Sequence, residues 1–172
     1  MRIWTIGHST HTLDGFAGLL AAHEIALLGD VRTVPRSRRH PHFGTEELAR
    51  SLPERGIAYR RFPALGGWRR AAGDSPNGAW RNASFRGYAD HTMSGEFREA
   101  LAMLREAAAE RRTAIMCAEA LWWRCHRRLI ADRLAAAGDT VCHIGSDGRA
   151  TEHALTAFAE VHADGGITYP AA

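Results

Sequence analysis

Short apolar runs rich in β-forming residues alternate along this chain with amphipathic helical segments, and this alternation narrows the possible folds more than any other feature. Five runs are predicted strands, at residues 3–6, 26–31, 57–62, 113–117 and 140–144. Apolar residues at helical spacing predict helices at about residues 12–23, 45–56, 97–112 and 125–137, and a last helix capped by Thr151. Strands that alternate with helices favour a mainly parallel sheet covered on both faces.

The predicted fold is therefore α/β: one three-layer domain over residues 1–172, with a central sheet of about five strands and helices on both faces. The length of 172 residues suits a single domain. Residues 64–82 hold four glycines and a proline, so we expect a long loop there, and loops of this length are usually functional or mobile. Residues 150–172 are expected to form a C-terminal helix and tail.

The composition is that of an ordinary globular domain and carries a modest positive charge. Apolar residues make up 45% and charged residues 24%, which excludes the disordered and fibrous classes. The net charge is +3, and arginine supplies all of the basic side chains because lysine is absent. Arginine binds planar anions through paired hydrogen bonds, so the charge is compatible with a phosphate-bearing partner but does not require one.

The chain has three cysteines, Cys117, Cys125 and Cys142, an odd and low count that makes a poor disulfide framework. No secretory leader is visible, and no apolar run approaches the 18 residues of a membrane span. We therefore expect a cytoplasmic protein with reduced thiols and no membrane partner.

Small or reactive polar residues follow every predicted strand. The sets are Gly7-His8-Ser9, Asp30 with Arg32, Arg36 and Ser37, Leu65-Gly66-Gly67, Cys117-Ala118-Glu119, and His143 with Gly145 and Ser146. In open parallel sheets ligands bind outside the carboxyl ends of the strands, so these residues are expected to share one site. The alternative is that β–α loops are polar in any protein.

These blocks resemble a bacterial family, the domain of unknown function 488. The resemblance rests on Ile6-Gly7-His8-Ser9, Asp30-Val31-Arg32 with Pro35-Arg36-Ser37, Leu65-Gly66-Gly67, Met116-Cys117-Ala118-Glu119 and Cys125-His126-Arg127, in this order over about residues 3–144. It implies an α/β fold and a cytoplasmic setting. It supports the choice of site residues more than any one reaction, because the activity of the family is unsettled.

Three residues are the candidate catalytic groups: Cys117, Glu119 and Asp30. Asp30 and Arg32 lie two residues apart on a strand, so their side chains share one face. They are either an acid or base beside an anion-binding arginine, or a structural ion pair. Cys117 lies at the end of a buried strand, where its thiol can act as a nucleophile or a ligand. The alternative is that it is only a small buried side chain. Glu119 can serve as general acid or base.

The candidate substrate-binding residues lie beside these groups and provide cationic, hydroxyl or small side chains. Arg127 opens a helix whose free amides favour anions, and the family resemblance singles it out among its neighbouring arginines. His126 is three and four residues before Leu129 and Ile130, which favours a buried histidine that faces the core. The full set is His8, Ser9, Arg32, Arg36, Ser37, Gly66, Gly67 and Arg127.

A metal site is weighed and not expected, and the sequence requires no cofactor. Cys117, Glu119, Cys125 and His126 are all ligand types, but the two cysteines are eight apart and no second paired motif exists. His8 and His143 could complete such a site only through the fold.

Four functions are considered. The first is an enzyme, a hydrolase or transferase, that acts on a small anion bearing a phosphate or resembling a nucleotide. The second is a nucleic-acid-binding accessory module, motivated by the arginines and by Trp68, Trp80, Trp122 and Trp123. A metal-binding protein is the third. Rhodanese-like sulfur transfer through Cys117 is the fourth, and it is disfavoured because the six-residue active loop is not evident.

Overall fold

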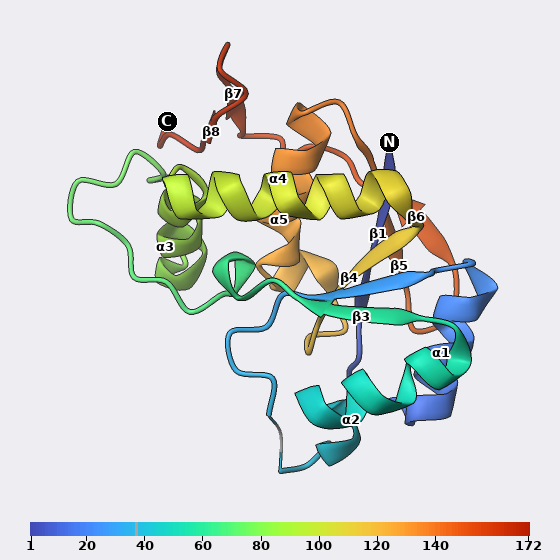
Figure 1. The fold of residues 1–172 in the computed structure, drawn as a ribbon. Helices are drawn as coiled ribbons and strands as arrows, with labels where there is room; N and C mark the ends of the chain where they lie inside the picture. The colour runs from blue at the N-terminus through green and yellow to red at the C-terminus, as the bar shows by residue number, and fades with distance from the viewer. Residues whose placement is uncertain (37) are drawn as a thin grey trace.

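The computed structural model describes residues 1–36 and 38–172 and shows a mixed six-stranded sheet between two layers of helices (Figure 1). The strand order across the sheet is β3-β2-β4-β1-β5-β6. The first five strands of the chain are parallel, and β6 runs antiparallel to β5. The bounds are β1 Arg2–Gly7, β2 Leu27–Asp30, β3 Ala58–Arg61, β4 Thr113–Cys117, β5 Thr140–Ile144 and β6 Ala150–Glu152. The prediction of a mainly parallel, three-layer α/β fold is confirmed.

Helices α1 (Leu13–Ala22) and α2 (Thr45–Ser51) cover one face of the sheet, and α4 (Gly95–Glu110) and α5 (Arg127–Ala136) cover the other (Figure 1). Each layer has its own buried core, because each helix turns one apolar stripe toward the sheet. One core contains Phe16, Leu20, Leu48 and Leu52, and the other contains Phe97, Leu104, Leu129 and Leu134. None of the described helices is both long and apolar enough to cross a membrane.

Helix α3 (Ala83–Thr92) has no counterpart among the predicted elements. Its N-cap is Asn82, whose side-chain oxygen accepts from the backbone amides of Ser84 and Phe85. Tyr88, Ala89 and Thr92 are buried at the spacing expected for one helical face. The cap and this spacing are sequence signals that predict the helix when they are taken together.

The prediction of a C-terminal helix in residues 150–172 was wrong. Thr151, the proposed cap, lies in β6 opposite His143 of β5. The segment then forms a small hairpin from β7 (Glu160–Val161) and β8 (Ile167–Thr168), and Tyr169 is buried after it. Pairing with the open edge of β5 decides the local structure, because an unpaired sheet edge offers a full row of hydrogen-bonding groups.

The connections leaving β1 and β4 run to opposite faces of the sheet. Strand β1 leads to α1 on one face, whereas its neighbour β4 leads to α5 on the other. The two strands stay paired to their ends, where the amide of His8 donates to the carbonyl of Cys117 at 2.9 Å. The chain then leaves β1 and β4 toward opposite faces, and open α/β sheets bind ligands in the crevice at such a switch point.

Candidate functional site

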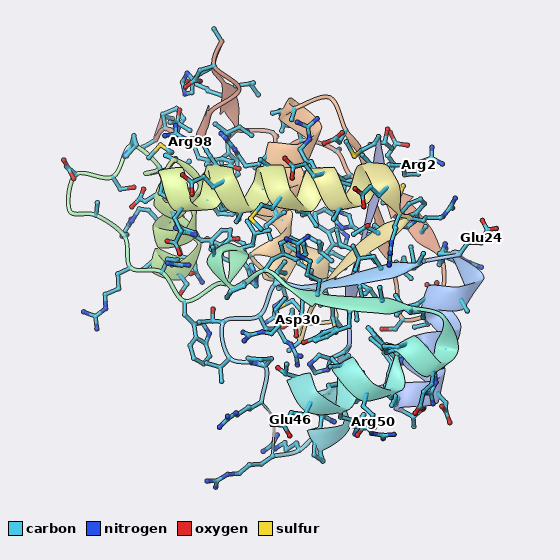
Figure 2. The ribbon with its side chains drawn as sticks, in the orientation of Figure 1. Arg2, Glu24, Asp30, Glu46, Arg50 and Arg98 are labelled. Carbon is cyan, nitrogen blue, oxygen red and sulfur yellow. The ribbon has the colours of Figure 1, made fainter. Side chains whose placement is uncertain are left out.

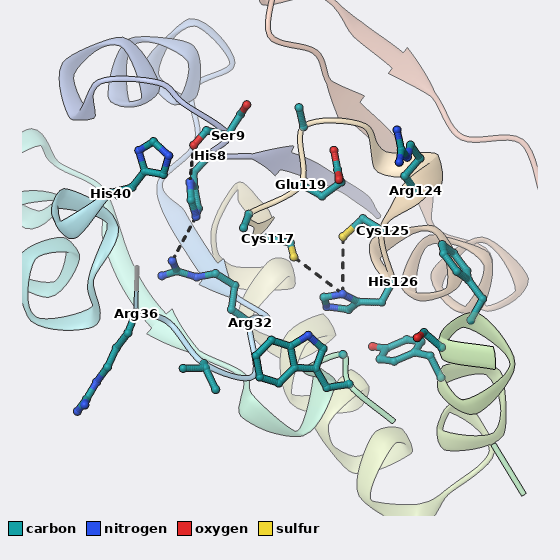
Figure 3. A pocket seen from close by; sticks show the side chains of 18 of the residues that line it. His8, Ser9, Arg32, Arg36, His40, Cys117, Glu119, Arg124, Cys125 and His126 are labelled. Carbon is teal, nitrogen blue, oxygen red and sulfur yellow. Dashed lines mark hydrogen bonds between the residues drawn. The ribbon is translucent and has the colours of Figure 1, made fainter. Parts of the chain in front are cut away.

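A cavity of about 750 Å³ opens at this crevice, between the loops that follow β1, β2 and β4 (Figure 3). Such a volume is within the range of small-molecule sites. Seven of the predicted site residues line it: His8, Ser9, Arg32, Arg36, Gly67, Cys117 and Glu119. Residues that are far apart in the sequence thus meet at one place, as the strand-end argument predicts.

Asp30, Gly66 and Arg127 do not line this cavity, although the sequence placed them in the site. Gly66 lies just behind it, where a Cβ would come within 2.7 Å of Thr33 Oγ1. Ser37, the remaining predicted residue, lies outside the described residues.

Asp30 is fully buried and its carboxylate is occupied by neighbouring groups. Arg32 donates to it from Nε at 2.9 Å and from Nη2 at 2.6 Å, and Tyr59 donates its hydroxyl at 2.6 Å. Figure 2 shows Asp30 in the interior, whereas Glu46 and Arg50 lie at the periphery. The geometry is that of the structural ion pair, in which Asp30 fixes Arg32 and Arg32 forms part of the cavity wall.

Arg127 is only 1% exposed and lies beneath the loop that joins β4 to α5. Its Nη2 donates to the carbonyl oxygen of Glu119, its Nε donates to Cys125 Sγ at 3.4 Å, and its Nη1 donates to Thr5 Oγ1 at 3.4 Å. These contacts position the loop and one sulfur. The free guanidinium expected from the sequence is therefore not available to a ligand in this structure.

Two sulfurs and one imidazole nitrogen meet in the cavity wall, and we call Cys117, Cys125 and His126 the sulfur–imidazole cluster. Their ligand atoms all lie within 4.8 Å of one another. His126 Nδ1 lies 3.9 Å from Cys117 Sγ and 3.6 Å from Cys125 Sγ (Figure 3). His126, the N-cap residue of α5, is half-buried and lines the cavity.

The two thiols of this cluster differ in their affinity for a proton. The hydrogen bond with Cys125, burial and the charge of Cys125 raise the pKa of Cys117 well above its ordinary value. Burial works against ionisation of Cys125 too, but the hydrogen bond from Cys117 and the proximity of His126 and Arg127 outweigh it and lower the pKa of Cys125. Cys125 is therefore the more acidic thiol of the pair.

Glycines allow the cluster to be this compact. A Cβ on Gly7 would overlap the carbonyl of Glu119, so only glycine lets the end of β1 lie against the loop after β4. A Cβ on Gly67 would stand 3.0 Å from His126 Nδ1. The backbone at Gly67 therefore approaches the imidazole of His126 closely, which a side chain at this position would oppose.

His8 is a neutral hydrogen-bonding group beside this cluster. Burial lowers its pKa to about 4. Its Nδ1 faces the carbonyl of Ser9 at 3.0 Å, so Nδ1 carries the hydrogen and Nε2 accepts from Arg32 Nη1 at 3.4 Å. Its ring also stacks on Phe43 with centroids 4.3 Å apart.

Arg36 and Arg124 are the arginines available at the cavity. Both side chains are exposed, and within residues 1–36 and 38–172 neither forms an ion pair. They lie on opposite sides of the two sulfurs in Figure 3. Glu119, also exposed, is the single carboxylate among the lining residues that the structure describes.

Sequence reasoning missed the wall that α3 provides. Ser84, Phe85 and Tyr88 line the cavity from this helix, and Trp68 lines it with 83% of its surface exposed. Trp68 also has a positive φ of 59°, which is uncommon for a bulky residue and frequent at functional sites. These aromatic groups give the cavity flat apolar surfaces beside its cationic rim.

A second polar group of side chains lies behind the site, which we call the buried histidine network: Thr5, His143, His153 and Asp132. Thr5 Oγ1 bonds His143 Nδ1 at 2.7 Å, His143 Nε2 bonds His153 Nδ1 at 2.9 Å, and His153 Nε2 bonds Asp132 Oδ1 at 2.9 Å. All four residues are buried. Trp122, one of the tryptophans considered for stacking, covers the ring of His143 at 4.0 Å.

A comparison with protein families found one match. A family profile described as "Domain of unknown function DUF488" matches residues 12–134, well over half of the chain. Searches of curated proteins and of solved structures gave no significant match. The matched range includes the loops after β2 and β4 and the start of α5, so most of the cavity lies within it.

Proposed function

The chain belongs to the family described as domain of unknown function DUF488, and from its cavity we propose that it binds and converts a small phosphate-bearing or nucleotide-like anion. The reaction class is hydrolysis or group transfer. One observation carries this proposal: unpaired arginines, a carboxylate and two sulfurs line the same cavity at the topological switch point. Exposed guanidinium groups that border one cavity are available to pair with an anionic ligand there.

Each lining residue has a role in this proposal. Arg36 and Arg124 hold the anion, and Glu119 moves a proton to or from the reacting oxygen. Neutral His8 offers the lone pair of Nε2 as a hydrogen-bond acceptor beside them. The exposed ring of Trp68 provides a flat surface on which a base or similar ring can stack.

The low cysteine count predicts a reducing, cytoplasmic setting, and such a setting would keep both thiols of the cavity free. The site could then use them as ligands or reactive groups. Oxidation of the pair would remove both lone-pair donors at once.

Isothermal titration with inorganic phosphate and with ADP tests the proposal. We expect binding by the wild-type chain, and affinity about 10-fold lower or worse in a variant that combines Arg36→Gln with Arg124→Gln, because two charge-assisted contacts are lost. Arg50→Gln is the matched control, since Arg50 is an exposed arginine on α2 away from the cavity. Equal affinities in all three proteins would refute the assignment of the anion site.

Turnover of a panel of phosphate esters tests the chemical role of Glu119. We expect Glu119→Gln to lower kcat by about 100-fold with little change in KM, the usual loss when a general acid or base is removed. Binding without turnover on every ester would support a binding module instead.

The nucleic-acid module is supported by one observation, the exposed Trp68 in a cavity rimmed by arginines. It predicts that a labelled single-stranded oligonucleotide binds and that its affinity falls steeply with salt. The absence of binding at low salt would exclude this alternative.

A further inference from the structure

We propose that the sulfur–imidazole cluster is a metal site, in which Cys117, Cys125 and His126 bind one zinc-like ion and leave a fourth position open to the cavity. The proposal goes beyond anion binding and does not depend on it, because the three donors come from the protein alone. It differs from the expectation drawn from sequence spacing, which gave no metal site.

The two sulfur–nitrogen distances are close to the corresponding edges of a zinc tetrahedron, and all three donor atoms lie within 4.8 Å of one another. With Zn–S bonds of about 2.3 Å and Zn–N bonds of about 2.0–2.1 Å, tetrahedral geometry sets the S···N edge at about 3.6 Å. The two S···N distances here are 3.6 Å from Cys125 and 3.9 Å from Cys117. The three donor atoms therefore need only small movements to share one ion.

The imidazole is fixed in the orientation and tautomer that a metal requires. His126 Nε2 lies 2.9 Å from the carbonyl oxygen of Val31, which can only accept, so Nε2 carries the hydrogen. The lone pair is then on Nδ1, the atom that faces both sulfurs. A ligating histidine whose other nitrogen donates to a carbonyl is the usual support around metal sites.

The surroundings suit two thiolates bound to a dication. Arg127 Nε donates to Cys125 Sγ from beneath, as expected for a group that stabilises a coordinating thiolate. Two thiolates neutralise a divalent ion, so the filled site adds no net charge to this half-buried wall. Paired thiolates with an imidazole select zinc-like ions over magnesium or calcium, which prefer oxygen donors.

The fourth position is open because, within residues 1–36 and 38–172, no further histidine, cysteine or carboxylate joins the three donors. Glu119, the other ligand type weighed from the sequence, is exposed, and its Oε1 accepts from the backbone amide of Leu121 at 3.2 Å. Cys117 and His126 line the cavity, so an ion between them would face it. Three protein ligands with one open position is the arrangement of catalytic zinc sites, where the ion polarises a bound oxygen.

Sequence spacing could not reveal this site. The eight-residue separation of the cysteines fits no zinc-finger pattern, because their loop runs from the end of β4 across the cavity to the start of α5. The fold, rather than a local turn, brings the two sulfurs together.

Cobalt titration of the full chain, reduced and stripped of metal under argon, tests the proposal. We expect one Co²⁺ per chain, with a thiolate-to-cobalt charge-transfer band and the intense visible bands of four-coordinate cobalt. Zinc should displace it, and mass spectrometry of the purified protein should find zinc in a one-to-one ratio.

Variants assign the signal to these residues. Cys117→Ser and His126→Gln should each weaken metal binding by more than about 100-fold, since changes around a site already cost 10–100-fold. Cys142→Ser is the matched control and should bind as the wild type does, because Cys142 is the one cysteine outside the cluster. Cys117 is half-buried at the cavity, so its serine variant tests the site even if Cys125→Ser does not fold.

Three results would overturn the metal site: no cobalt bands in the reduced wild-type chain, unchanged bands in Cys117→Ser, or loss of the bands in Cys142→Ser alone. A Cys117–Cys125 disulfide with no metal in protein purified under reducing conditions would assign the pair to redox chemistry instead. Phosphate titration of the same samples separates the two proposals, because anion binding by metal-free protein would survive failure of the metal site.

Discussion

The sulfur–imidazole cluster and the buried histidine network contain similar residue types, yet their lone pairs are used differently. In the network, both nitrogens of His143 and of His153 have a partner inside the protein. In the cluster, the partners of His126 Nδ1 in the described part of the chain are the two sulfurs at the cavity. Arg127 lies between them and bonds Thr5 of one and Cys125 of the other.

The network has a single consistent direction of donation. Arg127 donates to Thr5, Thr5 can donate to His143, His143 to His153, and His153 to Asp132. Each lone pair is satisfied, as buried polar groups must be. A closed set of polar contacts supports the fold, whereas lone pairs that converge on a cavity are available to a ligand.

The largest expected effect comes from breaking the network at its end. Asp132 is fully buried and accepts from His153, from the amide of Thr156 and from the hydroxyl of Tyr169. Asp132→Ala should lower the free energy of unfolding by about 3–5 kcal/mol, because buried donors lose their partner. Urea denaturation measures this free energy of unfolding. Cys117→Ser should change the free energy of unfolding by less than about 1 kcal/mol. Equal losses in the two variants would contradict the claim that the network supports the fold and the cluster does not.

The second effect in order of size is the loss of the network's contribution to stability at acidic pH. Burial and the neighbouring His153 and Arg127 lower the pKa of His143 to about 3, so the unfolded chain binds more protons below the ordinary histidine pKa. This histidine's contribution is present above about pH 6.5 and is lost as the pH falls toward 3, by up to about 1.4 kcal/mol per pH unit. Denaturation between pH 7 and 4 should show a shallower slope in His143→Gln than in the wild type. Parallel slopes would contradict the assignment.

Gly7→Ala should damage the site more than the network. The new Cβ would overlap the carbonyl of Glu119 and displace the loop that positions both sulfurs, at a cost of about 1–3 kcal/mol. Metal and anion affinity should fall together, as titration would show. Gly18→Ala is the control: Gly18 is in α1 with no atom within 4 Å of a Cβ, and this change should stabilise the chain by about 0.5–1 kcal/mol. Unchanged ligand binding in Gly7→Ala would mean that the loop is not fixed by this contact.

The smallest expected effect is that of Gly67→Ala. A Cβ 3.0 Å from His126 Nδ1 should move the ring slightly and weaken cobalt binding a few-fold, with the free energy of unfolding unchanged to within about 0.5 kcal/mol. Cobalt spectra and urea denaturation on one sample measure both quantities. A loss of stability without a change in the cobalt spectra would mean that Gly67 is needed for folding and not for metal binding.

The sequence predicted the sheet and the strand ends because both depend on local patterns. Apolar runs are read directly, and parallel strands bring their carboxyl ends to one edge. It could not predict which charged groups are already paired: Arg32 and Arg127 are held by neighbours, whereas Arg36 and Arg124 are not. That distinction depends on contacts between residues far apart in the chain.

Two further differences between the prediction and the structure have the same origin. The segment after residue 150 pairs with β5 because the fold leaves that edge open, which overrides its local helical signal. His143, considered as a metal ligand, instead joins the network behind the cavity. Helix α3 was predictable from its cap and spacing.

Diffraction at the zinc absorption edge, from crystals of the full chain grown with zinc and inorganic phosphate, tests the account most directly. We predict an anomalous peak about 2.3 Å from the sulfurs of Cys117 and Cys125 and about 2.0–2.1 Å from His126 Nδ1, with phosphate in the cavity beside Arg36 or Arg124. Zinc bound elsewhere, together with phosphate outside the cavity, would contradict the claim that the ligand-accessible lone pairs and unpaired arginines of this chain form one site.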